Sequence, residues 1–233
     1  MNKSIKTFCT SAVLACVASV GFTPSAWALS PFKADYQFAY NGKNVGSATR
    51  QLSQQNGQWV YVFSAKAGVI ASASETSRFS FANGIINSHN FSRTSKILVH
   101  NRSLSIAFNA ANKTINTNKD GTKRSFAWRA GSLDELNAEL QVREDLKNNA
   151  LKAQYWIADA KEVEGHRFVR QGAEQVKTNA GTFNTIKVVM QHRDPQRSTT
   201  FWLAPQLDYL PVKVTHKDEG TSYGLTLTKY TAK

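Results

Sequence analysis

Cysteine is almost absent from this chain, and its scarcity narrows the available chemistry. Both cysteines, Cys9 and Cys16, lie in the N-terminal stretch, so residues 29–233 contain none. That part of the chain therefore has no disulfide, no thiolate nucleophile and no cysteine-ligated metal. Its stability must come from a hydrophobic core, which about 200 residues are long enough to build.

Apolar runs of membrane-spanning length are missing too, because such a helix needs ~20 apolar residues. The longest candidate, residues 8–22, is shorter and is preceded by two lysines and no acid. Ala26-Trp27-Ala28 then supplies the small-x-small pattern of an export cleavage site. We therefore predict a signal peptide over 1–28, cleaved after Ala28, and a mature periplasmic chain that forms a single β-rich domain over 29–233.

One alternative for the N-terminus is a lipoprotein signal. Val13-Leu14-Ala15-Cys16 resembles a lipoprotein box, which would anchor the chain through a lipid on Cys16. Such boxes prefer a small residue where Leu14 stands, and the apolar run continues beyond Cys16. Cleavage after Ala28 is thus favoured, and anchoring at Cys16 is the competing hypothesis.

Acidic residues are scarce, with 16 Asp and Glu against 29 Lys and Arg, for a net charge of +13. Removal of two lysines with the signal peptide leaves about +11. No basic run exceeds Lys123-Arg124, so nucleic acid is not an expected partner. Scattered cations are typical of a solvated surface. They would also attract anionic lipid or acidic glycan and favour peripheral association with the envelope.

Helical periodicity is rare, whereas strand alternation recurs along the chain. In residues 32–40 the apolar side chains fall at every second position, which indicates a half-buried strand. Similar runs are separated by dipeptides that favour tight hairpins, such as Asn41-Gly42, Asn56-Gly57, Asn83-Gly84, Asp120-Gly121 and Glu219-Gly220. The pattern predicts a mainly β fold, an antiparallel up-and-down barrel or a curved sheet or sandwich.

One helix is expected, over residues 133–148. Ser132 and Glu135 have the spacing of a capping box, with Ser132 as the N-cap. Leucines then recur at helical spacing, and Lys147 suits the negative end of the helix. The apolar stripe is narrow, so we expect this helix to pack on the sheet.

Motifs for catalysis, metal binding or cofactor binding are lacking. No two of the five histidines have the spacing of a zinc site, and no nucleophile elbow or phosphate-binding glycine loop occurs. We therefore predict no catalytic residues, no metal and no cofactor. Glu162 and Glu164 are the one carboxylate pair that a hydrolase could use, and Glu-x-Glu beside a turn is more often solvated.

The C-terminal half carries a recognisable pattern. Its parts are Ala180-Gly181-Thr182-Phe183, Phe201-Trp202-Leu203-Ala204-Pro205 and Tyr209-Leu210-Pro211-Val212-Lys213, together with Asp134-x-Leu136, Gln141-x-Arg143, and Tyr36 followed by Gly46. These residues resemble the exported bacterial proteins grouped as domain of unknown function 3108. The resemblance covers most of residues 32–230. It implies a secreted or periplasmic β-rich protein and implies no reaction.

Arg143 is the strongest candidate for ligand binding, because an inward arginine calls for a carboxylate or an anionic ligand group. Asp134, on a similar helix face, and the aromatic Trp128 and Trp202 complete the candidate site. The favoured hypothesis is a periplasmic module that binds or carries an anionic, amphiphilic or lipid-like envelope component, and is not an enzyme. An envelope glycan- or lipid-acting hydrolase, or a structural or assembly factor, are the alternatives.

Overall fold

The computed structural model describes residues 29–233, so the predicted cleavage after Ala28 and the alternative anchor Cys16 lie outside the described residues. The strands are β1 (Phe32–Tyr40), β2 (Lys43–Gln55), β3 (Gln58–Ala67), β4 (Ala71–Ala82), β5 (Ile85–Ile97), β6 (His100–Asn109), β7 (Thr114–Lys119), β8 (Thr122–Ala127), β9 (Ser132–Leu133), β10 (Tyr155–Ala158), β11 (Val163–Thr178), β12 (Gly181–Gln191), β13 (Ser198–Ala204), β14 (Leu210–Asp218) and β15 (Thr221–Ala232). The helices are α1 (Glu135–Lys147) and the short 3₁₀ helix η1 (Pro205–Leu207).

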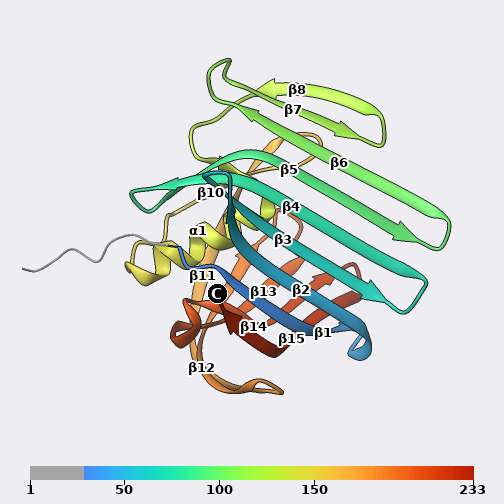
Figure 1. The fold of residues 1–233 in the computed structure, drawn as a ribbon, viewed down its shortest axis with the longest axis vertical. Helices are drawn as coiled ribbons and strands as arrows, with labels where there is room; N and C mark the ends of the chain where they lie inside the picture. The colour runs from blue at the N-terminus through green and yellow to red at the C-terminus, as the bar shows by residue number, and fades with distance from the viewer. Residues whose placement is uncertain (1–28) are drawn as a thin grey trace, which may run out of the picture.

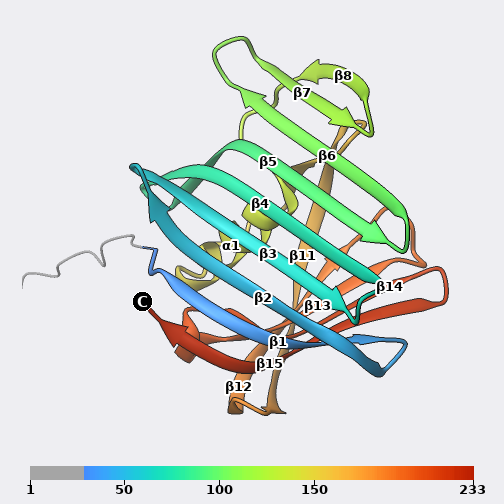
Figure 2. The ribbon, with the colours of Figure 1, turned by 45° about the vertical axis from the view of Figure 1, so that its right-hand side comes forward.

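All fifteen strands belong to one sheet in the order β8-β7-β6-β5-β4-β3-β2-β1-β15-β14-β13-β12-β11-β10-β9. Every neighbouring pair is antiparallel except β9 and β10, which run parallel. The sheet curves around α1 without closing, since β8 and β9 end the order and do not pair with each other (Figures 1 and 2). The predicted mainly β, antiparallel fold is confirmed, in its curved-sheet form.

Hairpin turns occur where the dipeptides predicted them. Asn41, Asn56 and Asn83 have φ values of 46°, 50° and 52°, in the left-handed region that asparagine tolerates better than most residues. Asp120 and Glu219 adopt the same conformation, at 50° and 43°. In each turn a glycine follows, as the tight turns of hairpins require.

The predicted helix exists, but its start was wrong. The N-cap is Asp134 and not Ser132: the Asp134 carboxylate accepts from the backbone N–H of Asn137 at 3.0 Å. Ser132 belongs to β9, and its hydroxyl donates to the carbonyl of Arg129 at 2.7 Å. The helix therefore begins two residues later than predicted, because β9 pairs with β10 and holds Ser132 in extended backbone.

The core lies between α1 and the concave side of the sheet. Residues 136–146 of α1 are all buried, polar ones included, so the helix is enclosed on almost every side (Figure 2). Its main neighbours in the sheet are β3, β4, β5, β9 and β10. No helix within residues 29–233 is long and apolar enough to cross a membrane.

Alternation gives the sheet an inner face toward α1 and an outer face away from it. On β4 the hydroxyl of Ser77 donates to Asp134 at 2.7 Å, so Ser77 is on the inner face. Its neighbours Thr76 and Arg78 consequently point to the outer face. On β5, buried Phe91 is inside and exposed Asn90 is outside in the same way.

Candidate functional site

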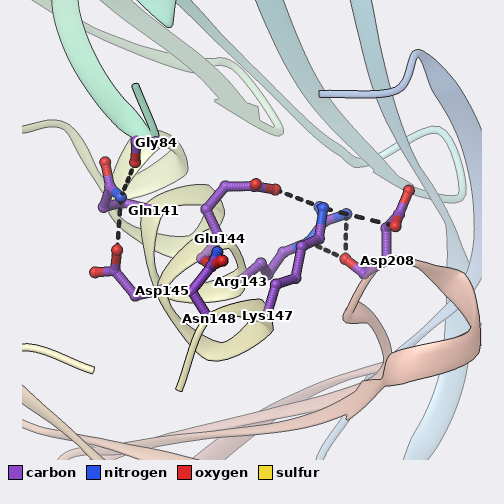
Figure 3. Close-up of polar contacts among 8 residues, drawn as sticks. All are labelled: Gly84, Gln141, Arg143, Glu144, Asp145, Lys147, Asn148 and Asp208. Carbon is purple, nitrogen blue, oxygen red and sulfur yellow. Dashed lines mark hydrogen bonds and ion pairs between the residues drawn. The ribbon is translucent and has the colours of Figure 1, made fainter. Parts of the chain in front are cut away.

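The polar side chains of α1 are paired with the sheet that surrounds them. Gln141 accepts from the backbone N–H of Ile86 at 2.8 Å and donates to the carbonyl of Gly84 and to Asp145 (Figure 3). Asp145 in turn accepts from the hydroxyl of Tyr155 at 2.7 Å. Buried polar groups need such partners to offset the loss of water. This network holds the helix in place, and the amide of Gln141 and the carboxylate of Asp145 are hydrogen-bonded within the protein.

A buried ion pair fixes the middle of the helix. Glu139 forms an ion pair with Arg50 of β2 and accepts from the hydroxyl of Tyr61 at 2.9 Å. Burial alone would lower the pKa of Arg50, but the carboxylate of Glu139 together with the hydroxyls of Tyr61 and Tyr36 outweighs burial and raises this pKa. Burial also raises the pKa of Tyr61 to about 12. Arg50 is therefore charged and Tyr61 is neutral at neutral pH.

Arg143 is buried near the end of α1, with 2% of its surface exposed. It donates to the carbonyl of Asp208 at 3.2 and 3.3 Å, and its guanidinium lies 5.1 Å from the ring centre of Phe32 (Figure 3). Its Nη1 is buried without a hydrogen-bond partner in the described part of the chain. Asp134 is at the other end of the helix, where burial raises its pKa to about 6.

The two tryptophan candidates lie on separate parts of the sheet. Trp202 on β13 lies between Lys187 and Lys213, whose ammonium groups are 5.5 and 4.7 Å from its ring centre. Its indole N–H donates to Glu174. Trp128 follows β8 and packs partly buried against the core. The contacts of residues 29–233 do not join Trp128, Trp202, Asp134 and Arg143 into one site, and their ligand-binding role stays a prediction.

The carboxylates considered for hydrolysis are already paired with a cation. Glu162 and Glu164 both reach Arg193, at 3.7 and 3.1 Å. Glu164 also lies 3.7 Å from His166. This arrangement resembles an exposed ion-pair cluster more than two carboxylates that face each other across a bound sugar.

Three histidines that the sequence showed as isolated lie in a row on the inner face. The rings of His166, His192 and His216 are spaced by 5.5 and 5.8 Å, and the hydroxyl of Thr199 contacts both His192 and His216. Burial, with the other two histidines, lowers the pKa of His192 to about 4. No three metal-ligating side chains within residues 29–233 are placed to hold an ion together.

The most site-like feature is a groove of about 780 Å³ on the outer face over β4–β8. Cross-strand pairing forms its floor from two adjacent rows, Thr76-Ser92-Ser105-Asn118-Lys123 and Arg78-Asn90-Ala107-Asn116-Ser125. Neighbouring strands are ~4.8 Å apart, so the five strands span about 19 Å. A surface of this width accommodates a ligand the size of a lipid headgroup or a short sugar chain.

The groove is cationic and rich in hydrogen-bonding groups. Arg78 and Lys123 belong to its outer-face rows, and none of its lining residues is acidic. Arg124 borders the groove from the row that contains Ser77 and Phe91, whose side chains point to the inner face. The remaining polar groups of the groove are hydroxyls and amides, which both donate and accept. The Oδ1 of Asn118 is buried and has no partner among the described residues, which is unusual for an amide. The groove can therefore bind an anionic ligand that also carries hydroxyl or amide groups.

A second cavity of about 480 Å³ continues the same face toward the ends of β3–β6. Its lining includes Ser74 and Thr94, two residues along their strands from Thr76 and Ser92 of the groove. Lys66 and Lys96 belong to its outer-face row, Arg102 borders it from the neighbouring inner-face row, and again no acid lines it. The half-buried strands of the sequence predict a sheet with one solvent-exposed face. Alternation could not show that five strands bring their polar residues together in a groove on that face.

Comparison with solved structures finds the same fold in one protein of known structure. A β-barrel-like protein of domain of unknown function DUF1849 from Brucella abortus is similar over 88% of this chain and 98% of its own, with a TM-score of 0.58 and 13% identity. A "putative lipoprotein" from Parabacteroides distasonis is similar over 87% of this chain and 96% of its own, with a TM-score of 0.35 and 9% identity. No curated protein matches the chain.

The sequence itself matches a family model. The model described as "Protein of unknown function (DUF3108)" matches residues 35–228, which include α1 and both cavities of the outer face. This confirms the resemblance that was drawn from the motifs of the C-terminal half. The chain belongs to the DUF3108 family.

Proposed function

We propose that the protein is exported to the periplasm, with cleavage after Ala28, and binds an anionic component of the cell envelope in the outer-face groove. Export is supported by the charged N-terminus, the apolar run and Ala26-Trp27-Ala28. Binding is supported by one observation above all: a groove of about 780 Å³ with the cations Arg78 and Lys123, many hydroxyls and amides and no acid. The ligand chemistry is an anionic group with neighbouring hydroxyls, as in a phospholipid headgroup or an acidic glycan.

The groove is a better place for the anion than the surroundings of Arg143. Arg78 and Lys123 are exposed, whereas Arg143 is enclosed and donates to the carbonyl of Asp208. The concave side of the sheet is already covered by α1, whose own side chains are buried against it. A ligand would reach the groove without displacing the helix.

Binding of soluble probes tests the proposal. The protein, produced from the full chain and purified, would be titrated with dihexanoylphosphatidylglycerol and with trigalacturonate. Dihexanoylphosphatidylcholine, which is zwitterionic, and maltotriose are the counterparts without net charge. The groove variant Arg78→Gln/Lys123→Gln removes two cations. The matched control, Arg170→Gln/Lys177→Gln, removes one exposed arginine and one exposed lysine from β11.

We expect calorimetric binding of one anionic probe, and the probe that binds identifies the source of the anion. Loss of a charge-assisted hydrogen bond costs about 1.5–3 kcal/mol, so the groove variant should bind at least tenfold more weakly while the control binds as the wild type does. Equal affinity for charged and uncharged probes, or equal losses in both variants, would refute the proposal.

Export is tested separately by the mass of the mature protein. We expect the periplasmic fraction to contain a chain that begins at Leu29. A diacylated Cys16 in the membrane fraction would favour the lipoprotein alternative instead.

A further inference from the structure

Large apolar side chains are exposed together at one end of the sheet. Val69 and Ile70 in the β3–β4 turn are 103% and 57% exposed, and Ile97, Leu98 and Val99 in the β5–β6 turn are 61%, 61% and 84% exposed. The two turns are joined, because the backbone N–H of Leu98 donates to the carbonyl of Ile70 at 2.7 Å. We call these five residues the apolar tip.

The β5–β6 turn departs from the turn chemistry of the rest of the chain. Ile97 pairs with His100, so Leu98 and Val99 form a two-residue hairpin loop. Leu98 has a φ of 54°, a left-handed conformation that is unfavourable for a bulky residue. Five of the six other two-residue hairpin loops within residues 29–233 have Asn-Gly, Asp-Gly or Glu-Gly at this position, and the sixth, between β11 and β12, is Asn179-Ala180. Folding alone would favour such a dipeptide here, so apolar side chains at this turn indicate a role in contact with a partner.

Exposed apolar surface is concentrated at this end of the molecule. Nine large apolar or tyrosine side chains are exposed within residues 29–233: Tyr40, Val45, Val69, Ile70, Ile85, Ile97, Leu98, Val99 and Tyr223. Tyr40 at the end of β1 pairs with Tyr223. Val45 precedes Gly46, which pairs with Ala67 at the end of β3. Tyr40, Tyr223 and Val45 therefore lie at the same end of the sheet as the apolar tip, where β1 and β3 end (Figure 2). Of the nine, Ile85 lies at the opposite ends of the strands, in the β4–β5 hairpin.

Cations lie directly behind the apolar tip. Residues 64–74 and 94–103, which contain both turns, include no Asp or Glu. Lys66, Lys96 and Arg102 line the 480 Å³ cavity that begins where the turns end. Apolar side chains at the extremity with a cationic layer behind them match the chemistry of an anionic membrane surface, with apolar acyl chains beneath negative headgroups.

We propose that the apolar tip inserts into the surface of a bilayer that contains anionic lipids, while Lys66, Lys96 and Arg102 contact its headgroups. The distances suit this arrangement: Leu98 is two residues beyond Lys96, or about 7 Å along an extended strand. Amphipathic surface elements bury their apolar part ~5–10 Å into the interface. A protein partner would not require cations on both faces of the sheet behind the tip, where Lys66 and Lys96 are on the outer face and Arg102 is on the inner face.

Vesicle sedimentation tests the proposal. The protein, produced from the full chain, would be mixed with vesicles of phosphatidylethanolamine and phosphatidylglycerol, and with vesicles of phosphatidylcholine alone. Leu98→Asp and Val69→Asp place a charge in the tip at exposed positions. Ile85→Asp is the matched control, since Ile85 is 51% exposed at the other end of the strands.

We expect binding to the anionic vesicles that weakens with salt, and at least a tenfold lower partition coefficient for Leu98→Asp and Val69→Asp than for Ile85→Asp. Absence of vesicle binding by the wild type, or equal losses in all three variants, would overturn the proposal. Self-association that the tip variants abolish, measured by analytical ultracentrifugation in place of vesicle binding, would also overturn it and assign the tip to a second copy of the chain. The titration with soluble probes tests the groove and the vesicle experiment tests the apolar tip, so either proposal can be refuted without the other.

Discussion

Removal of the charge on Glu139 should destabilise the protein strongly. Glu139 is 7% exposed and Arg50 is 6% exposed, and the guanidinium has the rings of Tyr36 and Phe63 within 5.9 and 5.1 Å. Glu139→Gln keeps the size of the side chain and an oxygen for the hydroxyl of Tyr61. The change leaves the buried charge of Arg50 without its counterion.

The magnitude follows from the burial of the pair. Breaking a buried ion pair by neutralising one partner costs about 3–5 kcal/mol. For a protein of this size 1 kcal/mol lowers the unfolding temperature by about 2–4 °C, so a loss of about 6–20 °C is expected. Glu135→Gln on the same helix is the control: Glu135 pairs with Arg93 at 2.5 Å but its side chain is 51% exposed. This exposed pair should contribute no more than about 1 kcal/mol.

Urea unfolding followed by far-UV circular dichroism measures both variants. The double variant Arg50→Met/Glu139→Gln removes both charges and keeps an acceptor for Tyr61, so it should recover much of the lost stability. A cost below about 1 kcal/mol for Glu139→Gln would refute the argument. A double variant as unstable as the single one would show that packing, and not the unpaired charge, sets the cost.

Three further predictions concern stability. Asp134 has its pKa raised to about 6 by burial, so the folded state holds a proton that the unfolded state loses from about pH 4 upward. Urea titrations should show the stability of Asp134→Asn rising relative to wild type from pH 4 to 6, by at most about 3 kcal/mol, and a constant difference would contradict this. His192, with its pKa lowered to about 4 chiefly by burial, changes the stability of the protein with pH in the opposite direction. Its protonation in the unfolded state removes stability as pH falls below about 6.5, and His192→Gln should reduce this acid loss in thermal unfolding. Asp134→Ala should lower the free energy of unfolding more than Ser132→Ala does, since Asp134 caps α1. Equal losses in urea unfolding would contradict the assignment of Asp134 as the N-cap.

Much of the fold could be predicted because strands and tight turns have local signals. Alternation in residues 32–40 and the Asn-Gly dipeptides depend on side chains and backbone within a few residues. The start of α1 could not be predicted in this way, because two capping candidates lie two residues apart. Asp134 was selected by the hydroxyl of Ser77, 57 positions earlier in the chain, while Ser132 joined β9. The choice between Ser132 and Asp134 as the N-cap thus depends on contacts with residues far away in the sequence.

The candidate site was harder to predict for the same reason. Arg143 points inward, but its acceptor is a backbone carbonyl, and backbone acceptors leave no signal in a sequence. The groove combines single residues from five strands, and its rows are defined by cross-strand register. One signal was available for the neighbouring cavity and the tip: residues 64–74 and 94–103 lack acids and contain apolar turns.

The cavities and the apolar tip belong to the same hairpins, and this constrains how they could act together. Ser72 lies beside the tip, and Arg78, on the same face of β4, lies in the groove. Six residues of extended strand separate them by about 20 Å. If the tip enters a bilayer, the smaller cavity lies at the depth of the headgroups and the groove lies above them. A lipid headgroup that remains in the membrane would then reach the smaller cavity and not the groove. The groove variant should therefore weaken binding of the soluble probe and leave vesicle binding almost unchanged. The tip variants should weaken vesicle binding and leave binding of the soluble probe almost unchanged.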